Sequence, residues 1–156
     1  MPGPVSQTSM LTWLPRRPVP VGLPQALHVL CLDNDPAILD GMQALLTRWG
    51  MSCDIARNVE EARGAAERRR PDLILADYHL DDPIDGLAAL DVLRDACSPP
   101  PPGALITADA SVDLKARARD LGYALLRKPV KPAALRALIA QLGRSTASEA
   151  RPVATA

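Results

Sequence analysis

Four polar groups each stand directly after a short apolar run, which is where a buried strand would end. They are Asp33-Asn34-Asp35, Asp77, Thr107 and Lys128. Carboxylates held close together repel each other and suit a hard divalent cation such as Mg²⁺. Such a cation can neutralise a phosphoryl group that arrives at one carboxylate, and a lysine is a compact counter-charge for the same anion. The set therefore predicts a carboxylate nucleophile that forms an acyl phosphate, with the threonine hydroxyl bound to a phosphoryl oxygen.

The elements that must bring these groups together are visible in the hydrophobic pattern. Five apolar runs alternate with five segments in which apolar residues recur at helical spacing. The runs predicted as strands are Leu27–Leu32, Ser52–Ala56, Leu73–Ala76, Ala104–Ile106 and Tyr123–Arg127. This alternation predicts an α/β fold, a doubly wound five-stranded parallel sheet with five helices and right-handed crossovers. Ligands of such sheets bind outside the carboxyl ends of the strands, where the four polar groups fall.

Capping residues and glycines mark the ends of the predicted helices. Asp35 and Pro36 are typical of a helix start, and Gly50 is typical of its end. Asn58 followed by Glu61 forms a capping-box pattern for the second helix. The remaining helices are predicted around Leu87–Cys97, over Val112–Leu121 after a cap at Ser111, and from Leu135 to a stop at Gly143.

The composition excludes several classes of protein. Of the 156 residues, 47% are hydrophobic and 23% are charged, as in a soluble globular domain. Eighteen basic and eighteen acidic side chains cancel, and only two Trp and two Tyr are present, so neither phosphate steering nor base stacking is favoured. No apolar run reaches the roughly 18 residues of a membrane span. We therefore predict a cytoplasmic protein with no nucleic-acid partner and no direct membrane contact.

Two flanking segments lack sustained hydrophobic periodicity. Residues 1–25 hold six of the sixteen prolines and are interpreted as a linker or arm. Residues 144–156 are small and polar and are predicted to be a disordered tail, which leaves 26–143 as the domain. Cys31, Cys53 and Cys97 are odd in number and lack metal-ligand spacing, so they are interpreted as reduced, mostly buried thiols.

With these residues, the stretch from Val29 to Leu142 resembles a two-component receiver domain, the phosphoacceptor module of response regulators and hybrid histidine kinases. The matching motifs are Leu32-Asp33-Asn34-Asp35, Leu75-Ala76-Asp77, Asp85-Gly86, Ile106-Thr107-Ala108 and Lys128-Pro129. The resemblance implies a flavodoxin-like sheet of order 2-1-3-4-5 and a histidine kinase or phosphotransfer protein as phosphodonor. It implies that Asp77 becomes the aspartyl phosphate, assisted by Thr107 and Lys128. The implied ligands of a Mg²⁺ or Mn²⁺ ion are Asp33, Asn34, Asp77 and the backbone carbonyl of His79, with Asp35 as a further candidate.

Two positions depart from the family pattern. Asn34 stands where a carboxylate normally binds the metal, so one charge is lost and Asp35 is the candidate to compensate. Leu125 stands where the family often carries a rotating Tyr or Phe, and the nearby Tyr123 is expected to be packed. Phosphorylation is therefore expected to reach the outer surface through backbone shifts.

Three residues beside the acceptor are expected to set the lifetime of the phosphate. His79 lies two positions beyond Asp77 and Asp109 two beyond Thr107, where their side chains can crowd or orient the attacking water. Ala108 leaves the phosphoryl group accessible. Because an imidazole titrates near neutrality, His79 is expected to make dephosphorylation pH-dependent between about pH 6 and 8.

Two alternative functions remain open at this point. Asp33-Asn34-Asp35 also resembles the Asp-x-Asp nucleophile and acid of haloacid-dehalogenase-like phosphatases, with Thr107 as the second motif. That interpretation leaves Asp77 unexplained and finds no acidic pair after Lys128. An inert pseudo-receiver used only for docking is disfavoured by the complete set of acceptor, threonine and lysine.

The residues outside the predicted domain indicate what kind of protein the receiver belongs to and how it passes on its signal. After the last predicted helix only residues 143–156 remain, so a stand-alone receiver or the receiver end of a hybrid sensor kinase is expected. Ser9–Pro15 faintly resembles the closing strand of a kinase ATP-binding domain, and Lys128–Pro132 resembles receivers fused to hybrid kinases. Output is expected to be protein contact through the fourth helix, the fifth strand and the last helix, with the oligomeric state left open. The basic residues on this face are Lys115, Arg117, Arg119, Lys131 and Arg136.

Overall fold

The computed structural model describes residues 27–109 and 111–150, with side chains up to Gly143. The strands in this part of the chain are β1 His28–Leu32, β2 Ser52–Ala56, β3 Leu73–Asp77, β4 Gly103–Thr107 and β5 Ala124–Arg127. They form one parallel sheet in the order β2-β1-β3-β4-β5, which confirms the predicted fold and strand order. The arm predicted over residues 1–25, including the resemblance at Ser9–Pro15, lies outside the described residues.

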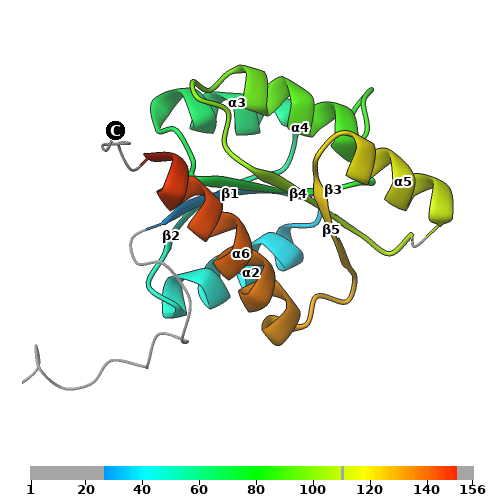
Figure 1. Cartoon of the computed structure of the whole chain (residues 1–156). Coiled ribbons are helices and arrows are strands. Elements are labelled where there is room, and N and C mark those ends of the chain that lie inside the picture. The colour runs from blue at the N-terminus through cyan, green and yellow to red at the C-terminus, as the bar shows by residue number, and fades with distance from the viewer. Residues whose placement is uncertain (1–26, 110, 151–156) are drawn as a thin grey trace, which may run out of the picture.

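Helices cover both faces of this sheet. They are α2 Pro36–Arg48, α3 Val59–Arg68, α4 Gly86–Asp95, α5 Val112–Asp120 and α6 Pro132–Ala150. Helices α2 and α6 lie on one face, and α3, α4 and α5 lie on the other (Figure 1). No helix in the described ranges is both long enough and apolar enough to cross a membrane.

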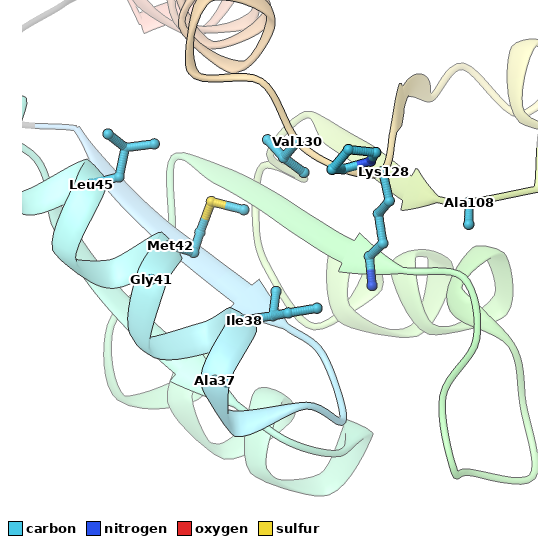
Figure 2. A pocket seen from close by; sticks show the side chains of 9 residues that line it. Ala37, Ile38, Gly41, Met42, Leu45, Ala108, Lys128 and Val130 are labelled. Carbon is cyan, nitrogen blue, oxygen red and sulfur yellow. The ribbon is translucent and has the colours of Figure 1, made fainter.

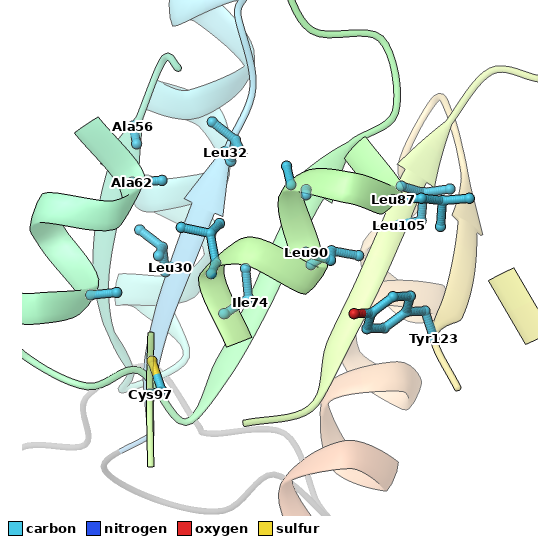
Figure 3. Close-up of a cluster of buried hydrophobic side chains, with 14 of the residues drawn as sticks. Leu30, Leu32, Ala56, Ala62, Ile74, Leu87, Leu90, Cys97, Leu105 and Tyr123 are labelled. Carbon is cyan, nitrogen blue, oxygen red and sulfur yellow. The ribbon is translucent and has the colours of Figure 1, made fainter. Parts of the chain in front are cut away.

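The central strands are buried on both sides, which explains their unbroken apolar runs. Leu30 and Leu32 of β1 point into the cluster under α3, α4 and α5, whereas Val29 and Cys31 point into the cluster under α2 and α6. Strands β1, β3 and β4 are buried along their whole length. Figure 3 shows the first cluster, in which Leu90 of α4 packs against the sheet. Such two-sided burial is typical of parallel sheets with helices on both faces.

Tyr123 belongs to the same cluster and is 5% exposed. Its hydroxyl donates a hydrogen bond to the carboxylate of Asp91, and the guanidinium of Arg94 lies 5.4 Å from its ring centre. Burial and the bond to Asp91 raise the pKa of Tyr123 to about 12. The expectation that Tyr123 is packed is confirmed.

Side-chain caps start α2, α3, α4 and α5, and those at Asp35, Asn58 and Ser111 confirm the prediction from the sequence. The caps and the backbone amides that they accept from are Asp35 with Ala37 (2.9 Å), Asn58 with Glu61 (2.8 Å), Asp85 with Ala88 (3.0 Å) and Ser111 with Leu114 (3.2 Å). The capping box of the second helix is displaced by one residue, because Glu61 accepts its bond from the amide of Arg57. Each cap satisfies an amide that has no partner within its helix.

The C-terminal boundary differs from the prediction. Helix α6 does not stop at Gly143 but continues to Ala150, so residues 144–150 are not a disordered tail. A glycine ends a helix when it takes a left-handed conformation, as Gly50 (φ 88°) and Gly122 (φ 85°) do in this chain. No proline follows Gly143 until Pro152, so no residue there blocks the helix. Residues 151–156 lie outside the described residues.

Candidate functional site

A lysine bridges two nearly buried carboxylates at the carboxyl edge of the sheet. The Nζ atom of Lys128 lies 3.1 Å from Asp33 Oδ2 and 3.3 Å from Asp77 Oδ1. The two carboxylate side chains are 7% and 6% exposed, and the lysine side chain is 21% exposed. Residues that are 44 and 51 positions apart in sequence thus share one small site, which is open on the side of the lysine.

Strand register places these groups at one level. Leu32 of β1 pairs with Ala76 of β3, so the residues that follow them, Asp33 and Asp77, stand side by side. Thr107 ends β4 opposite Arg127 of β5, and its carbonyl accepts a hydrogen bond of 2.9 Å from the amide of Lys128. Because parallel strands end at the same edge, the crossover topology alone brings all four chain segments together.

The electrostatics of the site favour a cation. Burial, followed by the charge of Asp33, raises the pKa of Asp77, while Lys128 and a backbone hydrogen bond from His79 act in the opposite direction. Burial also disfavours the charged form of Lys128, but its bonds to Asp33 and Asp77 outweigh this and raise its pKa. The lysine therefore stays protonated, and it leaves the repulsion between the two carboxylates only partly neutralised.

These opposing effects predict the direction in which the pKa of Asp77 moves in two variants. Lys128→Met removes a positive charge, so the pKa of Asp77 should rise further, and Asp33→Asn removes a negative charge, so it should fall. Titration of the Asp77 carboxyl carbon by NMR in metal-free buffer measures both. Equal pKa values in the wild type and both variants would contradict this account of the site.

The two aspartates of the acidic motif after β1 have different contacts: Asp33 belongs to the site, and Asp35 caps the next helix. Asp33 Oδ1 accepts a hydrogen bond of 2.9 Å from the amide of Asp35, so both of its oxygens are engaged. Asp35 is exposed, and its Oδ1 caps α2 through the amide of Ala37. Asn34 is half-buried and lines a polar pocket of about 620 Å³ together with His79 and the loop that follows it. Asn34 and His79, predicted as metal ligands, therefore share a pocket beside the two carboxylates.

Thr107 lies at the end of β4 and is fully buried. Its Oγ1 accepts a hydrogen bond of 2.9 Å from the amide of Asp109, which leaves the hydroxyl proton free to be donated elsewhere. The Asp109 carboxylate accepts a 2.9 Å bond from the amide of Ser111, and Ala108, between Thr107 and Asp109, is exposed. Asp109 therefore holds the turn after β4 in place through both its amide and its side chain.

The model of the response regulator receiver domain matches residues 29–140. The chain belongs to this family. Receiver domains are typically signalling domains, and membership of this family fits a phosphoacceptor role in a two-component system. The haloacid-dehalogenase-like alternative finds no support, and the Asp77 that it left unexplained lies at the centre of the site.

Named relatives and solved structures agree with this assignment. The response regulator protein PilR of Pseudomonas aeruginosa is 36% identical over 112 residues, which cover 71% of this chain and 25% of that protein. The DNA-binding transcriptional regulator NtrC of Proteus hauseri is 28% identical over 103 residues, which cover 65% of this chain and 21% of that protein. The chain thus spans about a quarter of the length of the curated relatives that it matches.

Two solved structures illustrate the likeness of the fold. A CheY-like receiver domain protein from Methanospirillum hungatei is 25% identical and superposes with a TM-score of 0.72, covering 80% of this chain and 99% of that one. The chemotaxis protein CheY4 of Vibrio cholerae is 22% identical, with a TM-score of 0.67 over 75% of this chain and 98% of that one, and it shows the fold alone.

Receiver domains generally bind Mg²⁺ in an acidic pocket, and the donor set of this receiver suits that ion. Two carboxylates, the Asn34 amide oxygen and a backbone carbonyl are hard oxygen donors, and the charge of Asp33 raises the pKa of Asp77. Within residues 27–109 and 111–143, no group of three or more His, Cys, Asp or Glu side chains is arranged to hold a metal. The carboxylates available here are the two of Asp33 and Asp77.

Gly86, at the start of α4, packs directly on Asp77. A Cβ atom at this position would lie 2.2 Å from the Asp77 carbonyl oxygen and 2.7 Å from the Tyr78 Cα. The Gly86 amide also donates a 2.9 Å hydrogen bond to the carbonyl of Tyr78. The glycine of the Asp85-Gly86 turn noted in the sequence is therefore required by space, because any side chain would push away the backbone of Asp77 and Tyr78.

A mostly apolar groove of about 560 Å³ opens next to Lys128 (Figure 2). One wall is formed by Ile38, Met42 and Leu45 of α2, and the other by Pro129 and Val130 after β5. These three residues of α2 recur at helical spacing in the sequence, but only Met42 is buried, whereas Ile38 and Leu45 are half-buried. The signal that sequence reasoning missed was an apolar stripe on α2 wider than its contact with the sheet.

Arg117 of α5 reaches the loop that follows Asp77. Its guanidinium lies 3.5 Å from the Tyr78 hydroxyl and 3.8 Å from the Asp85 carboxylate. The ring of Tyr78 in turn meets the exposed His79 ring edge-on, with centroids 4.9 Å apart. The other basic residues predicted on the output face, Lys115, Arg119, Lys131 and Arg136, are exposed. The receiver thus links the helix after Thr107 to the loop after Asp77 through a contact that spacing in the sequence does not reveal.

Proposed function

We propose that this receiver takes a phosphoryl group onto Asp77 from a phosphohistidine of a histidine kinase or phosphotransfer protein, and signals by protein contact. The observation that carries the proposal is the Lys128 ammonium held within 3.3 Å of both Asp33 and Asp77. A buried acceptor with a fixed counter-charge is suited to phosphoryl transfer, because the charge on the transferred group is neutralised on arrival.

The residues of this chain have separate roles in the transfer. The Asp77 carboxylate oxygen forms the new bond to phosphorus while the bond from phosphorus to the histidine nitrogen breaks, and the imidazole leaves. Lys128 shifts its ammonium toward the phosphoryl oxygens, and the Thr107 hydroxyl donates its free proton to one of them. A Mg²⁺ or Mn²⁺ ion held by Asp33, Asn34, Asp77 and the His79 carbonyl would supply further neutralising charge. The chain would modify itself and release no small-molecule product.

The groove beside Lys128 supports a protein as the phosphodonor. Its apolar walls flank the lysine that contacts the acceptor, so apolar side chains packed there would hold a phosphohistidine above Asp77. Incubation of the chain with a phosphorylated phosphotransfer protein and Mg²⁺ tests the proposal. Transfer of one phosphate per chain is expected, whereas no transfer from any phosphohistidine protein or small phosphodonor would refute it.

The groove leads to a separate prediction about transfer from a protein phosphodonor. Leu45→Gln, in the groove wall, should slow transfer from a phosphoprotein about tenfold, since lost apolar contact weakens docking. Transfer from acetyl phosphate, which needs no docking surface, should be unchanged. Ala44→Gln is the matched control, because Ala44 is exposed on the same helix and does not line the groove. Equal slowing with both donors would show that Leu45 acts on the site itself.

The signal is proposed to leave through α5, β5 and α6. Leu125 carries no ring that could rotate, so a phosphoryl group that draws Thr107 inward would move the turn held by Asp109 and the N-terminus of α5. Val112 at that N-terminus is 82% exposed, which offers an apolar contact for a partner. Hydrogen exchange with and without a metal-fluoride phosphate mimic should change protection first in α5 and its preceding turn. A change confined to the neighbourhood of Asp77 would refute this route.

The remaining expectations for the receiver stay predictions. The His79 ring is exposed beside the acceptor, and the decay of phosphorylated wild type and His79→Ala between about pH 6 and 8 tests its role in hydrolysis.

The relative NtrC is named as a DNA-binding regulator, and this chain shares only the receiver part of it. The net charge of zero supports the proposal that the chain itself binds no DNA. A cytoplasmic setting, alone or within a hybrid kinase, is likewise proposed from the family.

A further inference from the structure

Two cysteines from neighbouring strands lie in contact beneath α2. The sulfur atoms of Cys31 on β1 and Cys53 on β2 are 3.6 Å apart. Both side chains belong to the cluster on the α2 and α6 face of the sheet, whereas Cys97 belongs to the cluster on the opposite face. All three are free thiols. The sheet therefore separates one cysteine from the other two.

We propose that Cys31 and Cys53 are a redox-active dithiol, which a peroxide oxidises to an intramolecular disulfide that ties β1 to β2. The proposal does not rest on the phosphoacceptor role, because its chemistry involves only the two thiols and a peroxide. It rests on the contact between the sulfur atoms, on their unequal exposure and on the position of β2 in the sheet.

The unequal exposure sets the order of the chemical steps. Cys31 is 3% exposed, but Cys53 is half-buried and within reach of a small oxidant. The Cys53 thiolate attacks one peroxide oxygen, the O–O bond breaks, and a sulfenic acid forms as hydroxide leaves and takes up a proton. The Cys31 sulfur then attacks the Cys53 sulfur, its proton leaves with the displaced hydroxyl as water, and the S–S bond forms. In total two thiols and one hydrogen peroxide give one disulfide and two waters.

The pairing of the strands indicates that this bond is strained. Cys53 stands opposite Val29, and Cys31 opposite Ile55, so the two cysteines are diagonal neighbours. In a parallel pair, a strand spacing of about 4.8 Å and an offset of two residues at about 3.3 Å each place diagonal Cα atoms about 8 Å apart. This is beyond the roughly 4.4–6.8 Å that a relaxed disulfide spans. Among the strands of the described residues, β2 is at the edge of the sheet and pairs with β1 alone, and it is half-buried over most of its length. It is therefore the strand that can move to close the bond. A strained disulfide is more easily reduced, so the modification should be reversible.

Peroxide treatment of the full chain followed by mass spectrometry tests the proposal. The free thiols are expected to fall from three to one, with the loss of two hydrogens per chain and a Cys31–Cys53 peptide in the digest made without reductant. Dithiothreitol should restore all three thiols. Cys97→Ser, the control variant, should form the same disulfide, and Cys53→Ser should form none.

Several outcomes would overturn the proposal. One is that all three thiols remain unreacted, and another is that the disulfide forms with Cys97 or between two chains. The third is that Cys53 is oxidised to sulfenic or sulfinic acid while Cys31 remains a free thiol. The same reaction in a denaturant should lose its selectivity, because the folded sheet and not the sequence holds the pair together. If circular dichroism shows that Cys53→Ser does not fold, peptide mapping of the wild type and Cys97→Ser decides the question.

Discussion

Asp77→Asn is expected to abolish phosphorylation of the chain completely. The amide keeps the shape of the carboxylate but has no nucleophilic oxygen, so no acyl phosphate can form although Lys128 and Asp33 remain in place. The measurement is incorporation of phosphate from a phosphotransfer protein or a small phosphodonor, with and without Mg²⁺, followed by intact mass. The wild type should gain one phosphate only when the metal is present.

Asp95→Asn is the matched control for this experiment. Asp95 is an exposed carboxylate at the end of α4 and does not line the pocket of Asn34 and His79, so the variant should gain phosphate like the wild type. Phosphate found on Asp33, or on any Ser, Thr or His of Asp77→Asn, would contradict the assignment of the acceptor.

The same substitution should increase stability while it removes activity. Because the pKa of Asp77 is raised in the folded chain, ionisation of Asp77 costs free energy on folding, and this cost is present above the folded pKa and absent below the unfolded one. A neutral Asn avoids the cost, so Asp77→Asn should melt at a higher temperature than the wild type at pH 7. The difference should vanish in acid. A lower melting temperature at neutral pH would show that the Lys128 contact outweighs burial.

Gly86→Ala is expected to cause a large loss of stability. The new Cβ would stand 2.2 Å from the Asp77 carbonyl oxygen, and a backbone atom cannot turn aside as a flexible side chain can. Overpacking of this kind costs about 1–3 kcal/mol, and here the displaced atoms belong to the acceptor itself. Urea unfolding should therefore show a lower free energy of unfolding, and the phosphorylation rate should fall with it.

Gly41→Ala is expected to have the opposite effect, an increase in stability. Gly41 is exposed in α2, and no heavy atom lies within 4 Å of a Cβ built there. Alanine should stabilise that helix by about 0.5–1 kcal/mol, because glycine loses more backbone freedom on folding. Equal effects of the two substitutions would contradict the conclusion that contact with the acceptor backbone excludes a side chain at Gly86.

The sequence by itself determined the elements, their order and the edge of the sheet that carries the chemistry. Strands buried on both faces read as unbroken apolar runs, and caps such as Asp35 and Ser111 act on amides two or three residues away. Both signals are local, so they can be read without knowing the fold. Parallel topology then places Asp33, Asp77, Thr107 and Lys128 together, since every strand ends on the same edge.

Only the tertiary structure decided how those residues meet and what surrounds them. The bridge of Lys128 between two carboxylates, the approach of Gly86 to Asp77 and the contact of Cys31 with Cys53 all join residues distant in sequence. The groove follows from how far α2 extends beyond its contact with the sheet, and the end of α6 from the conformation taken by Gly143. Hydrophobic periodicity shows which face of a helix is apolar. Whether that face is buried depends on the elements that the crossovers place against it, and their placement is a property of the whole packed domain.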